Sequence, residues 1–386
     1  MTEGSGLIRG LEGVVAAETQ LCDLDGANGR LAYRGYDIAD LARLATFEQV
    51  TYLLLQGELP KPAQLDGFVV QLTAARAIPA ELIQAFRLMP EDTDPMRVLQ
   101  ASVAILGMSD PDTTDNSHAA NVRKAVRLTS QFATAICAHH RVRQGKEPVT
   151  PAAGLSHAAN FLYMLTGERP NQAATKAFDA SLTLYAEHEL NASTFTTRAI
   201  VSTQSDMHSA VAGGVGALKG PLHGGAGEAV MHTLMEIGEV GNVDAFTEKS
   251  LAAKRRFMGM GHRVYKTKDP RANILQGLAR ELFVKFGSSP LYDIAVELEK
   301  IAIDKLGPRG IYPNVDFYAG IVYNRLGIPT DIFTPIFAVS RVAGWAAHWM
   351  EQMRHNRLFR PTMVYQGEHN VPYVPMSERK ERVRTA

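Results

Sequence analysis

Four stretches of the sequence place histidine, acidic or arginine residues at glycine- or proline-marked breaks between helical patterns. They are YAEHELNAST (185–194) with His188, KGPLHGGAGEAV (219–230) with His223, RFMGMGHRVYKTKDPRA (256–272) with His262 and Arg271, and GIYPNVDFYAG (310–320) with Asp316. Arg341 in AVSRVAGW and Arg360 in NRLFRP stand out near the C-terminus. Histidines, one carboxylate and several arginines therefore recur without a nucleophile or a metal pattern.

This set of residue types suits one kind of chemistry. A carboxylate base can remove a proton from a carbon next to a carbonyl while neutral donors hold the enolate oxygen. His223 precedes a predicted helix, whose N-terminal potential disfavours imidazolium, so it can donate as a neutral ring. Arginines suit dianionic substrates because their planar fork binds both oxygens of a carboxylate. The residues alone indicate enolisation, or carbon–carbon bond formation or cleavage, on a polycarboxylate.

Each residue also has a purely structural interpretation. Asp316 follows a Pro-Asn turn and, taken alone, is typical of a helix N-cap. His188 can cap a helix C-terminus, and Arg341 in an apolar helix can belong to a buried ion pair. Lys266 and Lys268 are typical of a solvated surface.

Several other classes of site are disfavoured. GGVGALKG (213–220) lacks the glycine before lysine of a P-loop and the third glycine of a dinucleotide fingerprint. CAHH (137–140) is too compressed for a zinc site. GLSHA (154–158) lacks the second glycine of a nucleophile elbow.

Composition indicates an ordinary globular protein. The 386 residues include 40 basic and 40 acidic residues and are 46% hydrophobic, so nucleic acid or an anionic membrane is not expected as the main partner. Cys22 and Cys137 are too few for a disulfide framework, which favours a reducing compartment. The N-terminal stretch has neither signal-peptide nor transit-peptide character, and the uncharged run 149–167 contains proline, glycine, histidine and asparagine. We expect a cytoplasmic protein in which this run is a buried loop and helix.

The periodicity predicts an all-α fold. Thr46 and Gln49 form a capping box before a helix that ends at Gly57, and a second helix begins at Asp94-Pro95 and is expected to end at Gly107. Further helical patterns cover the following ranges: 117–143, 171–189, 205–218, 244–257, 272–286, 290–306 and 334–357. Asp25-Gly26 and Asn28-Gly29 predict one small N-terminal β-hairpin.

In these stretches of polar residues between helical patterns, here called islands, the chain resembles the citrate synthase family. EHELNAST, KGPLHGG, GMGHRVYKTKDPRA, YPNVDFYAG, FTPIFAVSRVAGW and NRLFRP occur in that family's order and spacing, and LEGVVAAET and YRGYDIADLA resemble its N-terminal region. The resemblance implies an acyltransferase with three catalytic residues. Asp316 would deprotonate acetyl-CoA, His223 would stabilise the thioester enol, and His262 would polarise oxaloacetate. The citryl thioester would then be hydrolysed to citrate and CoA, the entry into the tricarboxylic acid cycle.

The same resemblance implies how the substrates bind. His188, Arg271 and Arg341 would hold oxaloacetate, with Arg360 contributed from the second subunit of a homodimer. Acetyl-CoA would be a co-substrate, with no permanently bound cofactor and no metal. The candidates for contacts to CoA phosphates are Arg263, Lys266 and Arg309.

The resemblance also implies a domain division. A large helical domain (1–224 and 328–386) would be interrupted by a smaller helical domain (225–327) that closes over the substrates. One departure is Gly227, where the family usually has asparagine; it bears on the start of the helix beside His223.

Two rivals stay open. 2-Methylcitrate synthase performs the same reaction with propionyl-CoA and shares every motif; citrate synthase is preferred because GIYPNVDF and FTPIFAVSRVAGW fit that branch best. A catalytically silent CoA- or carboxylate-binding helical protein is disfavoured because binding alone needs no base such as Asp316.

Overall fold

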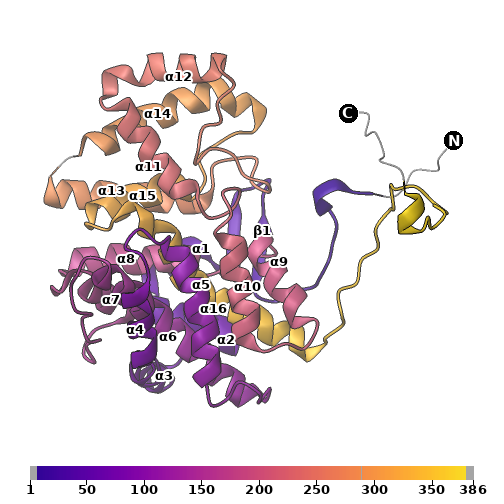
Figure 1. Cartoon of the computed structure of the whole chain (residues 1–386). Helices are drawn as coiled ribbons and strands as arrows, with labels where there is room; N and C mark the ends of the chain where they lie inside the picture. The colour runs from indigo at the N-terminus through magenta and orange to yellow at the C-terminus, as the bar shows by residue number, and fades with distance from the viewer. Residues whose placement is uncertain (1–6, 288, 380–386) are drawn as a thin grey trace. The chain divides into compact units, whose positions relative to one another are not determined.

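The computed structural model describes residues 7–287 and 289–379. These fall into two compact units, one formed by 7–18 with 359–379 and the other by 19–358. The smaller unit contains two short 3-10 helices, η1 (Arg9–Leu11) and η5 (Met376–Glu378). The larger unit contains every α-helix and strand of the described chain (Figure 1). The predicted all-α class with a small N-terminal sheet is confirmed.

The helices of the larger unit cover most of its length. They are α1 (Ile38–Leu44), α2 (Phe47–Gln56), α3 (Pro62–Ala74), α4 (Ala80–Leu88), α5 (Pro95–Ser109), α6 (His118–Val142), α7 (His157–Thr166), α8 (Gln172–Tyr185), α9 (Ala192–Val201), α10 (Met207–Leu218), α11 (Ala226–Ile237), α12 (Val243–Ala252), α13 (Pro270–Phe286), α14 (Pro290–Leu306), α15 (Asp316–Arg325) and α16 (Phe333–Arg354). Three 3-10 helices join them, η2 (Val240–Asn242), η3 (Gly307–Arg309) and η4 (Thr330–Ile332).

The predicted hairpin is present and carries a third strand that was not predicted. β1 (Cys22–Asp25), β2 (Arg30–Tyr33) and β3 (Tyr36–Asp37) form an antiparallel sheet in that order. The turn between β1 and β2 is closed by Asp25, whose Oδ1 accepts the N–H groups of Ala27 and Asn28 at 3.1 and 3.0 Å. This is the local hydrogen bonding that favours aspartate in turns.

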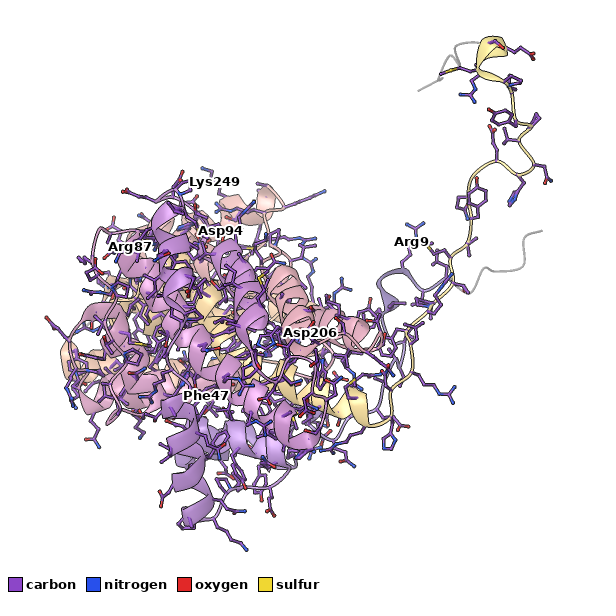
Figure 2. The ribbon with its side chains drawn as sticks, turned by 60° about the horizontal axis from the view of Figure 1, so that its bottom comes forward. Arg9, Phe47, Arg87, Asp94, Asp206 and Lys249 are labelled. Carbon is purple, nitrogen blue, oxygen red and sulfur yellow. The ribbon has the colours of Figure 1, made fainter. Side chains whose placement is uncertain are left out.

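Side-chain caps fix where several helices begin. The predicted Thr46–Gln49 capping box is confirmed, and Gly57 ends α2 in the left-handed region with a φ of 95°. Asp94 and Asp206 (Figure 2) cap α5 and α10, with Oδ1 accepting the N–H of Met96 and Ser209 at 2.7 and 2.8 Å. Each cap satisfies an otherwise unpaired N–H group of the first turn.

Helix α16 runs through the core. It is buried along almost its whole length, including Trp345 and Trp349, and it packs against α2, α6, α8, α9 and α10. A helix that is apolar on all sides is stable only in such surroundings. The run 149–167 is likewise a loop followed by the buried helix α7, as predicted. Among the described residues, no helix has the length and apolar character needed to cross a membrane.

The prediction that α5 ends at Gly107 is wrong, because the helix continues to Ser109. Gly107 serves close packing: a Cβ there would lie 2.8 Å from Cβ of His208 on α10. Gly213 and Gly214 of GGVGALKG have the same use within α10. A Cβ on Gly214 would lie 3.2 Å from the Trp345 ring, and one on Gly213 would lie 2.3 Å from Cδ1 of Ile200.

We expect Gly107→Ala to destabilise the protein and Gly67→Ala to stabilise it. Both glycines lie within helices, where alanine is favoured by roughly 1 kcal/mol. At Gly67 a Cβ would meet nothing within 4 Å, so that gain is retained. At Gly107 overpacking costs about 1–3 kcal/mol and outweighs it. Urea unfolding midpoints of the two variants test this, and a raised midpoint for Gly107→Ala would contradict it.

Candidate active site

The loop that carries His262 is paired with the loop that precedes Asp316. The N–H of Gly261 donates to the carbonyl of Tyr312 at 2.7 Å, and the N–H of Asn314 donates to the carbonyl of Gly259 at 2.8 Å. Backbone hydrogen bonds therefore join two loops that are about fifty residues apart in sequence. The structure requires glycine here, since Gly259 and Gly261 have φ values of 75° and 86°.

His262 is held as a neutral ring. Its Nδ1 accepts the backbone N–H groups of Val264 and Tyr265 at 3.0 and 3.2 Å. A peptide N–H can only donate, so the ring proton lies on Nε2. Burial, followed by the charge of Arg271, lowers the pKa of His262 to about 4.

His188 lies beside His262, just after the end of α8. The two ring centroids are 5.1 Å apart, and Nε2 of His188 is 3.3 Å from the Tyr265 hydroxyl. Burial and then Arg271 hold the pKa of His188 well below its usual value. The preceding segment is fixed to the sheet, because the Tyr33 hydroxyl donates to the carbonyl of Glu187 at 2.7 Å.

Asp316 is the first residue of α15 and is buried. The helix N-cap is Val315, so the interpretation of Asp316 as the N-cap is wrong. Its carboxylate Oδ1 instead accepts a hydrogen bond from the Tyr185 hydroxyl at 2.7 Å. Burial raises the pKa of Asp316 to about 6, while the hydrogen bond from Tyr185 and the charge of Arg271 oppose the rise. A carboxylate with such a pKa is suited to act as a general base near neutrality.

His223 lies between α10 and α11, before a helix as predicted. Its Nε2 accepts the backbone N–H of Ser193 at 3.3 Å and is 2.8 Å from the Ser193 hydroxyl oxygen. The ring proton therefore lies on Nδ1, the opposite tautomer to His262. Burial and then Arg341 lower the pKa of His223 to about 4. Both rings can thus donate a hydrogen bond without carrying charge.

Two buried arginines lie among these groups. Arg271 is in the first turn of α13 and forms a two-pronged pair with Asp269, with Nε to Oδ1 at 3.0 Å and Nη2 to Oδ2 at 2.7 Å. Arg341 is 1% exposed on α16. Its Nε donates to the carbonyl of Tyr185 at 2.7 Å, and its guanidinium lies 4.7 Å from the Phe337 ring centroid. Burial lowers the pKa of Arg341.

The remaining predicted residues differ from these groups in exposure or in the unit to which they belong. Arg263, Lys266 and Arg309 are exposed. The interpretation of Lys268 as a solvated charge is wrong: it forms an ion pair with the buried Glu299 and lies 5.4 Å from the Tyr318 ring centroid. Arg360 belongs to the smaller unit, where its Nη1 donates to the carbonyl of Pro361 at 2.7 Å. In the part of the chain that the structure describes, no cluster of three or more histidine, cysteine or acidic residues could hold a metal ion.

The model of the citrate synthase family (C-terminal domain) matches residues 10–362 of this sequence. The chain belongs to the citrate synthase family. It is 48% identical to a citrate synthase of Synechocystis over 98% of this chain and 96% of that one. It is 44% identical to the citrate synthase of Deinococcus radiodurans over 97% of this chain and all of that one.

Solved citrate synthase structures have the same fold. The Thermotoga maritima enzyme superposes with a TM-score of 0.88 at 41% identity, covering 97% of this chain and 99% of that one. The Thermoplasma acidophilum enzyme, solved as a ternary complex with carboxymethyl coenzyme A and oxaloacetate, has a TM-score of 0.91 at 37% identity. It covers 96% of this chain and 98% of that one.

Three residues of this citrate synthase fold were missed although they lie inside the islands recognised from sequence. Tyr185 bonds Asp316, Ser193 bonds His223, and Asp269 pairs with Arg271. Each lies within the stretches YAEHELNAST or KTKDPRA. The available signal was a polar residue flanking a candidate residue, but only the folded contacts distinguish such a partner from a turn or a cap.

We expect His223 and His262 to be neutral and in opposite tautomers above pH 5.5. His223 should carry its proton on Nδ1 and His262 on Nε2, because the backbone occupies the other nitrogen of each ring. Two-bond ¹H–¹⁵N correlation spectra, assigned with His223→Asn and His262→Asn, read the tautomers directly. An imidazolium signal at pH 7, or the same tautomer for both rings, would contradict this geometry.

Proposed function

We propose that this chain catalyses the citrate synthase reaction, with Asp316, His223 and His262 as its catalytic residues. The supporting observation is the combination of a buried carboxylate whose pKa is near 6 with two half-buried histidines that are neutral and oppositely protonated. Relatives named citrate synthase match over nearly the whole chain. The reaction condenses acetyl-CoA with oxaloacetate and hydrolyses the citryl-CoA to citrate and CoA.

The enolisation step follows from the protonation states. Asp316 removes a proton from the methyl group of acetyl-CoA, and Nδ1–H of His223 donates to the thioester oxygen as the enol forms. Neutral donors in a buried site stabilise the developing charge without first having to lose a proton. Ser193 orients the His223 ring by occupying its Nε2.

The condensation step uses the second histidine. Nε2–H of His262 donates to the keto oxygen of oxaloacetate, which makes the keto carbon more electrophilic, and the enol carbon attacks it. His188, Arg271 and Arg341 hold the substrate carboxylates. The buried positions of both arginines suit this role, because a guanidinium binds a dianion most strongly where water is excluded.

The CoA contacts and the domain division belong to the same proposal. Exposed Arg263, Lys266 and Arg309 suit the phosphates of CoA. In this proposal residues 225–327 form an inserted helical domain between the two parts of the large domain, 1–224 and 328–386. This inserted domain is distinct from the smaller unit of residues 7–18 and 359–379. In its favour, α11 packs against α14 and α15, α12 against α14, and α13 against α15, a cluster visible at the top of Figure 1. Closure of such a domain would exclude water from the enol.

We further infer a homodimer in which Arg360 reaches the partner's site. The smaller unit of residues 7–18 and 359–379 exposes large apolar side chains, among them Val15, Met363 and Tyr373 at 89%, 95% and 82%. Such side chains are expected to be covered by another surface. A cytoplasmic location and entry into the tricarboxylic acid cycle complete this proposal.

2-Methylcitrate synthase activity is the second candidate. A small apolar cavity adjoins Asp316, lined in part by Gly224, Gly227, Ala319 and Gly320. In the proposed reaction the acyl methyl group meets Asp316 beside these small residues, so the length of the acyl group that fits is decided here. A 2-methylcitrate synthase of Mycobacterium tuberculosis is 42% identical over 93% of this chain and 90% of that one. Acetyl-CoA stays first because the relatives at 44–48% identity are named citrate synthase.

Thiol release from acetyl-CoA and from propionyl-CoA, each with oxaloacetate, tests the proposal. We expect release from both, with the higher kcat/KM for acetyl-CoA. Asp316→Ala and His262→Ala should each lower kcat by roughly 10²- to 10⁴-fold, the contribution of a positioned acid–base group. No release from either thioester would refute the enzymatic function, and a higher kcat/KM for propionyl-CoA would favour the second candidate.

A further inference from the structure

Tyr185 is fixed at three points beside the proposed base. It is the last residue of α8 and is 2% exposed. Its carbonyl accepts from Nε of Arg341 at 2.7 Å, and its ring centroid lies 4.6 Å from that of Phe337. Its hydroxyl donates to Oδ1 of Asp316 at 2.7 Å. A side chain held in this way has little freedom, so it can hold its partner in one orientation.

Gly227 lies close to the same carboxylate oxygen. It is in the first turn of α11, and a Cβ placed there would lie 4.0 Å from Oδ1 of Asp316, with no other heavy atom nearer. A polar side chain at position 227 would therefore be directed toward Asp316. With glycine there, the cavity beside Oδ1 stays open, and the Tyr185 hydroxyl supplies the side-chain hydrogen bond to this carboxylate in the described structure.

The charges around Asp316 do not fix its orientation. Arg271 and Arg341 attract the carboxylate and Asp269 repels it, but Arg271 is paired with Asp269 and Arg341 with the carbonyl of Tyr185. Tyr323 lines the same cavity and interacts with Asp316 through space. Coulomb attraction varies slowly with angle, whereas a hydrogen bond is directional. Directional control of the carboxylate therefore comes from Tyr185.

We propose that Tyr185 is a positioning residue for the reaction: its hydroxyl holds Oδ1 of Asp316 and so fixes the plane of the carboxylate relative to the methyl group of the acyl thioester. This role rests on the proposed function of Asp316 as the base. Loss of the hydroxyl leaves the carboxylate free to rotate and removes a donor that stabilises its charged form. Both the rate and the pH dependence should therefore change, whereas binding of oxaloacetate should not.

Tyr185→Phe is the direct test, since it keeps the ring against Phe337 and the carbonyl bond to Arg341. We expect kcat with acetyl-CoA to fall about 10- to 100-fold, with KM for oxaloacetate nearly unchanged. Removing a donor to the charged form raises the pKa of Asp316. The acid limb of the kcat/KM profile should therefore move upward by about one pH unit, and the defect should be larger at pH 6 than at pH 8. Gly227→Asn in the Tyr185→Phe background should restore part of kcat by supplying an amide donor.

Tyr318→Phe is the matched control. It also removes a buried tyrosine hydroxyl, from the same helix as Asp316, but that hydroxyl bonds Glu299 and Gln276. It should lower the melting temperature without moving the acid limb. If Tyr185→Phe likewise changed only the melting temperature, the positioning role would be refuted. A ¹³C titration of the Asp316 carboxyl, assigned with Asp316→Asn, gives a readout independent of turnover. An unshifted midpoint in Tyr185→Phe would overturn the proposal, whereas absent thiol release by the unaltered chain would refute only the proposed function.

Discussion

Burying a carboxylate among cations and keeping it basic is the constraint on which this site depends. Full burial favours the protonated acid, whereas unshielded arginines nearby would hold the carboxylate charged and weakly basic. In this chain Asp269 neutralises Arg271, the carbonyl of Tyr185 takes up Nε of Arg341, and the Tyr185 hydroxyl bonds Asp316. The result is a pKa of about 6, between these two extremes.

The same arginines and the same burial keep His188, His223 and His262 uncharged. Charged rings would compete with the arginines for substrate carboxylates and would hold Asp316 as a poorer base. The hydrogen bonds from Ser193, Val264 and Tyr265 then choose which nitrogen of His223 and His262 faces the site. Burial sets the charge of each ring, and backbone N–H groups set its direction.

Much of the fold could be predicted because its signals are local. The capping box at Thr46, the proline at the start of α5 and the Asp-Gly and Asn-Gly turns all depend on neighbours within a few residues. Gly107 was wrongly predicted to end α5, because its role is a contact with His208, a hundred residues away. Lys268 was wrongly assigned as a solvated charge for the same reason, because its partner Glu299 lies on α14. The islands gave the candidate residues, but the tautomers and the partner of Asp316 depend on contacts between distant segments.

Deuterium exchange at the acetyl methyl group tests the role of Asp316 most directly. Acetyl-CoA in D₂O is incubated with the protein and a four-carbon dicarboxylate that lacks the keto group, so that enolisation proceeds without condensation. We predict that the unaltered protein incorporates deuterium, that His262→Asn still does so, and that Asp316→Asn is slower by at least about 100-fold. Exchange by Asp316→Asn at the rate of the unaltered protein would contradict the assignment of Asp316 as the base.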